Sequence, residues 1–363
     1  MNCKNTILLL VLCFLSPLVN ADNYKETRNV SKSIKTEENS RINVTNKYGS
    51  ISINTWEKDS VHIAIELTIS GSNKTKVEKL ASNIDFKFSG DESDYYVETE
   101  FGNDFNTFWN DLKSQSQLII PGGKNVEINY TIYAPENIGL SLTNKYGEIY
   151  LDDFGGNLKI NLSNGVLNTG VLRARNDIQL NFCDAIIDGS SDGEINISYT
   201  DLTLKSCQNL KLTSRSSTIH IGEAASLSLD TRRDKVFISN VDMMKGESYF
   251  SKLSLDNIGK EMEYTVKYGM LEITQINQEL GRLKLTLRNT EVNLYVPKQF
   301  SSSIDVIIEK TVFKYPAEYD KLDIKVTDDD HKSFHVTGNT GSLPPSSQLS
   351  INAIKGSLNI LYK

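Results

Sequence analysis

The chain contains 363 residues, with a formal charge of −7 and a pI near 5.3. This acidic balance argues against a nucleic-acid partner, which needs a net basic surface. A chain of this length would ordinarily form two domains, but repeat folds grow by adding units along one axis, so length does not settle the domain count.

Residues 1–21 have the features of a secretory signal peptide. Lys4 precedes a short apolar run from Ile7 to Leu15, and the small residue Ala21 ends the segment. Cys13 follows Leu12 rather than the small residue that a lipoprotein cleavage site needs, so a lipid anchor is disfavoured. No later stretch approaches 18 apolar residues, so we expect no membrane span. The leader predicts export to the periplasm or the cell surface.

The segment after the leader is expected to form a loose lead-in followed by an amino-terminal cap. Residues 22–40 are polar and lack periodicity, and we expect a loose lead-in. Residues 41–138 begin with one unit, Ile42 to Ile53, and continue with alternating strands, a short helix over Lys74 to Ala81 and an inserted loop at 101–116. These strands should cap the amino end, because an open terminal strand exposes unpaired backbone groups.

The central residues, 139–297, repeat one pattern about nine times. Each copy has an apolar pair Φ-x-Φ, about six mostly polar residues and a second such pair. The first members of the second pairs recur every 16 to 21 residues, with a mean near 18. The second pairs are Ile149/Leu151, Leu167/Thr169, Ile186/Asp188, Leu202/Leu204, Ile219/Ile221, Val236/Ile238, Leu253/Leu255, Leu271/Ile273 and Val292/Leu294.

This repeat predicts strands that wind around a single axis. Alternation places the Φ residues on one face of each strand. The residue two before each second pair is small or turn-forming, as at Gly147 and Asp234, and we expect the chain to turn there, through positive φ or a local hydrogen bond. Antiparallel hairpins would not keep a fixed period. The predicted fold is all-β, a single-stranded parallel β-helix (β-solenoid) of about 18 residues per rung, with irregular capping strands at both ends.

The period lapses over residues 298–363. Strands are expected over Ser303–Glu309, Leu322–Val326 and Ser333–Thr337, and the unit returns once more from Leu349 to Ile360. We expect this last unit to close the carboxyl end of the stack.

Several short segments resemble the bacterial putative-adhesin family of secreted β-solenoids, which includes the auto-transporter-adhesin "head GIN"-like domains. The resemblance is carried by Val44 to Ile53 with Trp56, Tyr133-Ala134-Pro135, Leu140 to Ile149 and Gly356 to Ile360. It implies a parallel β-helix without established catalysis and with an adhesive or envelope role. The family provides no catalytic residues to assign to this chain. The insertion at 101–116 and the Asp, Ser or Thr residues at the corners depart from its pattern.

Clusters of catalytic or metal-binding residues are weak in this sequence. Asp184 and Asp234 are expected in one corner column, three rungs or roughly 14 Å apart, too far for a glycosidase pair. Asp at these corners is better explained by turn capping. His331 and His335 would lie roughly 13 Å apart along a strand, which disfavours a metal site. His220 should face outward between Thr203 and Phe237. We therefore expect no enzyme, catalytic residue, metal or cofactor.

One column of side chains stands out. Four residues before the second pairs lie Lys47, Lys145, Arg215, Arg232, Lys267 and Arg288, and three before lie Tyr48, Tyr146, Tyr199, Arg233, Phe250 and Tyr268. Stacked rungs would turn these residues into a stripe that holds an extended sugar or polyanion by ring stacking and charge-assisted hydrogen bonds. The simpler explanation, which we favour from the sequence alone, is an aromatic ladder that only stabilises the corners.

The sequence therefore predicts a secreted, non-catalytic, adhesin-like interaction module whose partner is a glycan or an envelope or surface protein. The alternatives are a polysaccharide lyase or hydrolase on a β-helix scaffold, and a purely structural spacer. Export permits a disulfide, but the repeat places Cys183 and Cys207 at different corners, so we expect two free thiols.

Overall fold

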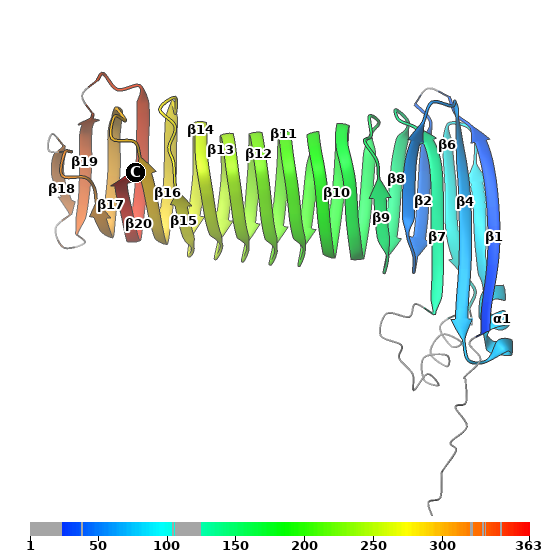
Figure 1. Cartoon of the computed structure of the whole chain (residues 1–363). Helices are drawn as coiled ribbons and strands as arrows, with labels where there is room; N and C mark the ends of the chain where they lie inside the picture. Colours follow the sequence, from blue (N-terminus) through cyan, green and yellow to red (C-terminus); the bar gives the residue numbers. More distant parts are fainter. Residues whose placement is uncertain are drawn as a thin grey trace, which may run out of the picture.

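The protein is an elongated stack of β-strands, most of them parallel (Figure 1). The computed structural model describes residues 24–37, 39–103, 105, 125–319, 322–328, 330, 332–341 and 343–363. The predicted leader and most of the loop at 101–116 lie outside these residues. The all-β solenoid fold is confirmed. Within the described residues, no helix has the length and apolar character needed to span a bilayer.

The central array is formed by strands that pair in parallel with the next rung. In the middle of the array, Asp184, Asp201, Thr218, Lys235 and Lys252 are successive register partners, each 17 residues after the last. The strands are β8 (Gly139–Lys145), β9 (Glu148–Leu151), β10 (Leu158–Ser198), β11 (Asp201–Arg215), β12 (Thr218–Arg232), β13 (Lys235–Tyr249), β14 (Lys252–Lys267), β15 (Met270–Ile273) and β16 (Arg282–Val296).

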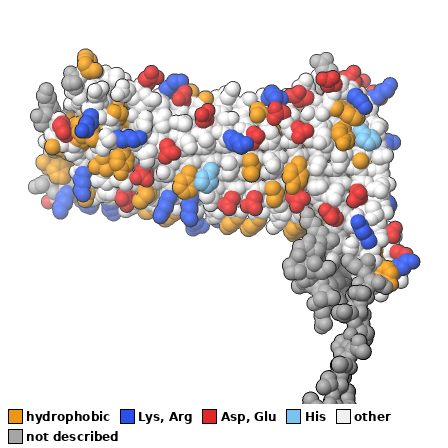
Figure 2. All heavy atoms as spheres, viewed as in Figure 1, with side chains coloured by type: hydrophobic (Ala, Val, Ile, Leu, Met, Phe, Trp, Pro, Cys, Tyr) orange, Lys and Arg blue, Asp and Glu red, His pale blue; other side chains and the backbone are white. Residues whose placement is uncertain are grey.

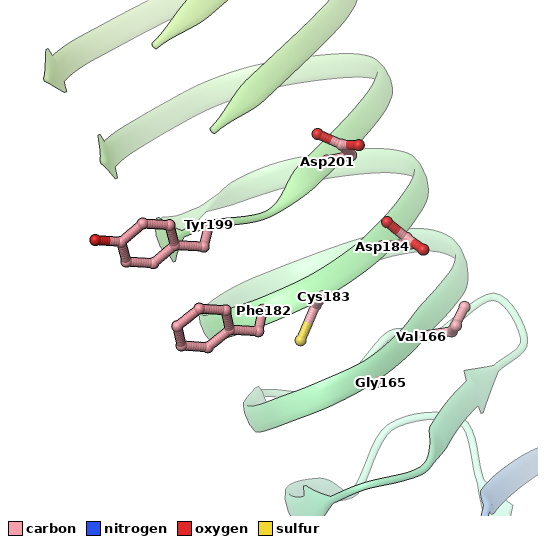
Figure 3. Close-up of a pocket in the computed structure, with 7 residues that line it drawn as sticks. All are labelled: Gly165, Val166, Phe182, Cys183, Asp184, Tyr199 and Asp201. Carbon is pink, nitrogen blue, oxygen red and sulfur yellow. The ribbon is translucent and has the colours of Figure 1, made fainter. Parts of the chain in front are cut away.

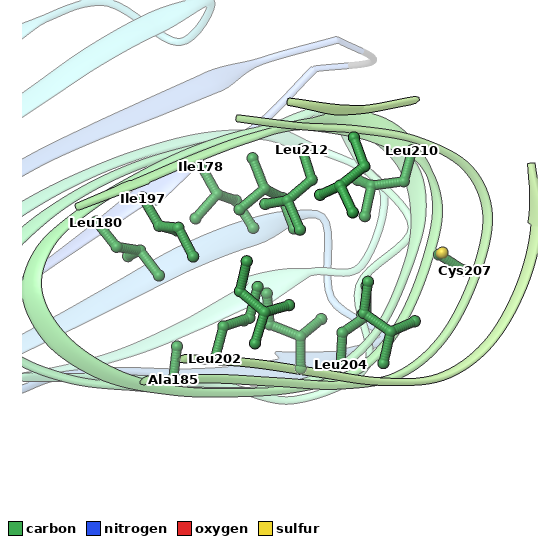
Figure 4. Packing of buried hydrophobic residues seen from close by; sticks show 14 of the residues in the cluster. Ile178, Leu180, Ala185, Ile197, Leu202, Leu204, Cys207, Leu210 and Leu212 are labelled. Carbon is green, nitrogen blue, oxygen red and sulfur yellow. The ribbon is translucent and has the colours of Figure 1, made fainter. Parts of the chain in front are cut away.

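The core is a set of apolar columns that run along the axis. Ile219, Val236 and Leu253 are neighbours in adjacent rungs and are at most 1% exposed. Figure 4 shows inward side chains from both faces of the flattened coil, with Leu202 and Leu204 opposite Leu210 and Leu212. No rung can bury these side chains alone, so the hydrophobic stabilisation arises from stacking.

One rung differs from the predicted register. Ala185 and Ile187, rather than Ile186 and Asp188, pair with Leu202 and Leu204 and are buried, whereas Ile186 is 45% exposed. The sequence pattern is ambiguous here because apolar residues occupy both alternating sets. Stacking on the next rung decides between them.

The amino end is capped by antiparallel strands. β2 (Arg41–Lys47) and β3 (Ile51–Trp56) form a rung on β8 and β9. The capping elements are β1 (Tyr24–Lys35), β4 (Ser60–Gly71), α1 (Lys74–Ser82), β5 (Ile84–Gly90), β6 (Asp94–Phe101) and β7 (Val126–Pro135). Parallel pairs β2–β6 and β3–β7 extend the stack, and antiparallel pairs β4–β7, β5–β6 and β1–β4 end it.

The expected loose lead-in is wrong over Tyr24–Lys35, because this segment is strand β1. Its side chains are mostly exposed on both faces, which explains why the sequence lacks an apolar alternation. Its charged residues suit an edge strand, since charge discourages further strand pairing. The predicted helix is confirmed as α1, where the Asn73 side chain accepts a hydrogen bond from the Lys76 N–H.

The carboxyl end contains an inserted rung. The last unit is present as β20 (Ser347–Tyr362), but it pairs in parallel with both β16 and β17 (Ser302–Lys314). The chain therefore returns into the stack instead of closing it. The outer layer beyond β17 consists of the antiparallel strands β18 (Asp323–Asp328) and β19 (Ser333–Thr340).

Cys183 and Cys207 are free, as expected, and both are buried. Burial raises the pKa of both thiols, and that of Cys207 to about 12. Because the thiolate is the nucleophile, we expect a maleimide at pH 8 to label neither cysteine in the folded protein. Both should be labelled after denaturation without reductant, as read by peptide mass mapping. An unlabelled pair in the denatured chain would reveal a disulfide and contradict this expectation.

Candidate functional site

The candidate site is the corner between the first and second strands of each rung, which we call the αL corner. Its outermost residue has positive φ in successive rungs: Tyr48, Tyr146, Asn164, Phe182, Tyr199, Ser216, Arg233, Phe250, Tyr268 and Asn289. In most of these rungs its backbone N–H donates to a carbonyl in the next rung, as Tyr199 does to Arg215 at 3.0 Å.

The turn lies one residue earlier than the sequence suggested. Gly147 and Gly165, predicted to adopt positive φ, do not do so. Their role is close packing: a Cβ on Gly147 would lie 1.8 Å from the Gly49 carbonyl oxygen. In other rungs a Ser, Thr or Asp takes this inner position and bonds the adjacent backbone, as when the Thr200 N–H donates to Ser217 Oγ at 3.2 Å.

Exposed aromatic rings stack in pairs along the αL corner. The ring centroids of Phe182 and Tyr199 lie 4.8 Å apart, and the ring planes make an angle of 2° (Figure 3). Phe250 and Tyr268 stack at 5.0 Å and 13°, and Tyr48 and Tyr146 at 5.6 Å and 9°. Of these rings, Tyr146, Phe182, Tyr199, Phe250 and Tyr268 are all more than 40% exposed.

The local backbone does not explain these rings. Positive φ is costly for bulky residues, and Asn tolerates it better. Asn164 and Asn289 hold the same position in two rungs of this corner. The aromatic residues must therefore contribute something else, either ring stacking, worth about 0.5–1.5 kcal/mol per pair, or a binding surface.

Basic side chains precede the rings in the same corner. Strand register stacks Lys47 on Lys145 at one end, and Arg215, Arg232, Tyr249, Lys267 and Arg288 in order further along. The Lys145 ammonium lies 5.0 Å from the Tyr146 ring centroid, and Lys267 donates a 2.6 Å hydrogen bond to the Tyr249 hydroxyl. Figure 2 shows basic and apolar side chains along the lower edge, where strands β11 to β14 end in Figure 1.

All twelve residues predicted to form the stripe lie on this corner: Lys47, Tyr48, Lys145, Tyr146, Tyr199, Arg215, Arg232, Arg233, Phe250, Lys267, Tyr268 and Arg288. Their role in binding stays a prediction. Phe182 was missed because the register error placed Cys183 at its position. If Ala185 and Ile187 had been taken as the second apolar pair, Phe182 would have been placed correctly, because the residue with positive φ lies three positions before that pair.

A shallow hollow of about 500 Å³ adjoins the ring pair Phe182 and Tyr199. Figure 3 shows the carboxylates of Asp184 and Asp201 stacked above one another beside it. Both carboxylates are exposed, and neither makes an ion pair with a residue that the structure describes. The hollow thus offers ring faces and hydrogen-bond acceptors on adjacent rungs.

The expectation that Asp184 and Asp234 share a column is wrong. Asp184 points outward and pairs in register with Asp201, whereas Asp234 lies inside the corner between Ser217 and Ser251. The Asp234 carboxylate accepts from the backbone N–H groups of Ser217, at 2.7 Å, and Arg232, at 2.6 Å. It therefore ties two rungs together and is a structural group.

Burial raises the pKa of Asp234, although its hydrogen bonds act in the opposite direction. The folded protein then binds this proton more readily than the unfolded chain. The contribution of Asp234 to the free energy of unfolding must therefore rise as the pH falls from the raised pKa of the folded state to the lower pKa of the unfolded chain. We expect the stability of the wild type relative to Asp234→Asn to increase between pH 7 and pH 4 in urea denaturation. A pH-independent difference would contradict a raised pKa.

The histidines offer little for catalysis. His220 faces outward, as predicted, and its ring stacks on Phe237 at 4.8 Å. His335 Nε2 lies 2.8 Å from an Asp305 carboxylate oxygen, while His331 lies outside the described residues. Among the described residues, no group of three or more His, Cys, Asp and Glu side chains is placed to hold a metal.

No protein-family model matches the chain, and no curated protein matches it. Solved structures with some similarity include a putative adhesin from Parabacteroides distasonis, at 10% identity over 73% of this chain and 92% of that one, with a TM-score of 0.28. A putative adhesin from Bacteroides fragilis has 9% identity over 92% and 97%, with a TM-score of 0.28. A putative lipid binding protein from Parabacteroides distasonis has 9% identity over 92% and 96%, with a TM-score of 0.24. Similarities this low do not assign a function.

Proposed function

We propose that the protein is an exported, non-catalytic interaction module that binds an extended carbohydrate polymer along its αL corner, in the periplasm or at the cell surface. The observation that carries this proposal is the two exposed aromatic pairs, Phe182/Tyr199 and Phe250/Tyr268, whose members are held at positive φ in adjacent rungs. Ring faces are apolar platforms for the C–H faces of pyranose rings, and neighbouring charged groups accept or donate hydrogen bonds to hydroxyls.

The direction of the corner suits a polymer. Rungs repeat about every 4.8 Å along the axis, which is close to the rise of one pyranose unit in an extended chain. A polysaccharide laid along the corner would therefore meet one rung for each sugar. The resemblance to secreted β-solenoid adhesins suggested by short sequence motifs is compatible with this role.

Asparagine substitutions separate binding from corner stability. In Phe182→Asn/Tyr199→Asn and Phe250→Asn/Tyr268→Asn, the new side chains tolerate positive φ, so the fold should survive while the ring surface is lost. We expect affinity for a polysaccharide that the wild type binds to fall about tenfold or more. The matched control is Phe237→Ser, which removes an exposed stacked ring from the adjacent face and should leave affinity unchanged. A purely structural ladder predicts no polysaccharide binding by the wild type and a lower melting temperature in both double variants.

The enzyme alternative is tested on the same polymers. An interaction module should show saturable retention on the immobilised polysaccharide and release no reducing ends over many hours. A β-helix lyase or hydrolase would release oligosaccharides, and substitution of its carboxylates, such as Asp184→Asn/Asp201→Asn, would stop that release. Product formation that depends on these aspartates would replace the proposed function with catalysis.

A further inference from the structure

The αL corner is divided by charge. Over five rungs from β11 to β16 its outward positions carry seven cations: Arg215, Arg232, Arg233, Lys235, Lys252, Lys267 and Arg288. The Phe182 and Tyr199 rungs carry Asp184 and Asp201 instead. This basic segment occupies roughly 19 Å along the axis, within a protein whose formal charge is −7.

Several cations on the other faces of the solenoid differ from these because each has a carboxylate partner. On the remaining faces, Lys205, Lys211 and Lys260 each lie within 3.0 Å of a carboxylate, those of Asp188, Glu194 and Asp242 respectively. No cation of the basic segment forms an ion pair with a described residue, and only Lys267 has a side-chain partner, the uncharged Tyr249 hydroxyl.

Among the described residues, the acids near the basic segment form no ion pair with its cations. Asp234 is buried and its carboxylate already accepts backbone N–H groups from two rungs. Asp230 lies two residues before Arg232 in β12, and Glu247 lies two residues before Tyr249 in β13. The Asp230 carboxylate accepts a hydrogen bond from the Glu247 N–H. Glu291 lies in the last rung of the segment. Like charges on adjacent rungs repel one another, and an anionic ligand bound along them would relieve this repulsion.

From this arrangement we infer that the ligand is an acidic polysaccharide, whose carboxylate or sulfate groups lie on the basic segment while its sugar rings stack on Phe250 and Tyr268. This inference rests on the proposed function and specifies its ligand class. Each of the five rungs carries at least one guanidinium or ammonium group, which is enough to meet one anionic group per sugar. Arginine, which supplies four of the seven cations, binds planar carboxylates through two parallel hydrogen bonds.

The test uses polygalacturonate and the same polymer after complete methyl esterification, which removes its charge and keeps its backbone. Arg215→Gln/Arg232→Gln/Arg233→Gln should weaken binding of the acidic polymer about tenfold or more and flatten its salt dependence, because three exposed charge contacts are lost. All three side chains are exposed, so thermal unfolding should be unchanged. The control Lys205→Gln/Lys211→Gln/Lys260→Gln removes the same charge from other faces and should bind as the wild type does.

Each other outcome has a defined consequence. Equal losses in both triple variants would overturn the inference, because net charge alone would then govern binding. Equal affinity of the wild type for the acidic and esterified polymers would overturn it and leave the proposed function intact. If the wild type bound no polysaccharide at all, the proposed function would fail as well. Tighter binding of duplex DNA or of anionic phospholipid vesicles, lost in the arginine variant, would overturn the assignment to carbohydrate.

Discussion

Gly147→Ala is expected to destabilise the protein by about 3 kcal/mol, near the upper end of the cost of overpacking. The added Cβ would lie 1.8 Å from the Gly49 carbonyl oxygen and 2.7 Å from its carbonyl carbon. These are backbone atoms of the adjacent rung, held in register by the β2–β8 and β3–β9 pairs, so they cannot move without opening the stack. A shift of the urea midpoint, followed by circular dichroism, measures the effect.

Gly281→Ala is the matched control. Its added Cβ would meet only the Lys260 carbonyl oxygen at 3.6 Å, an ordinary van der Waals distance, and Gly281 has no positive φ. Its stability should stay within about 0.5 kcal/mol of the wild type. If Gly147→Ala unfolded at the same urea concentration as Gly281→Ala, the rungs could not be as closely stacked as described.

Tyr264→Ala is expected to cost about 4 kcal/mol, the usual loss for truncating a buried aromatic side chain. Tyr264 is 1% exposed and stands in register with Gly246, which in turn pairs with Leu229. Gly246 has no side chain, so the tyrosine ring fills the interior that a leucine fills in other rungs. The tyrosine hydroxyl reaches across and donates to the carbonyls of Leu229, at 3.0 Å, and Glu247, at 3.1 Å.

Tyr264→Phe separates packing from hydrogen bonding. It keeps the ring and removes the hydroxyl, so it should cost only about 1 kcal/mol. Urea denaturation of the two variants gives the comparison. A loss for Tyr264→Phe as large as that for Tyr264→Ala would mean that the hydroxyl, rather than the ring volume, holds these rungs together.

The solenoid could be predicted from the sequence because buried apolar residues alternate with exposed polar residues along each strand of a stacked coil. Ile219, Val236 and Leu253 recur at the period of the rung and lie in one column. The same rule failed at Ile186, where apolar residues occupy both alternating sets and only contact with Leu202 and Leu204 chooses between them. Phe182 was lost from the predicted stripe for that reason.

Two further features depend on contacts between distant segments. The place of β20 between β16 and β17 is set by pairing across more than 40 residues, and no local pattern specifies that order. The edge strand β1 shows little alternation because one face is exposed and the other is only partly buried, through Val30 and Ile34. At the αL corner, the sequence indicated a turn but not which residue takes positive φ. Glycine residues such as Gly147 were expected to do so, but positive φ falls on the preceding residue, which is often aromatic.

Side chains on successive rungs should act together as one linear binding site. The basic segment that binds the acidic ligand runs from Arg215 to Arg288, four rung steps or roughly 19 Å. Calorimetric titration with acidic oligosaccharides of increasing length tests the claim most directly. Affinity should rise with each added sugar until the oligosaccharide matches this length, and then level off. A disaccharide that binds as tightly as the polymer would contradict it.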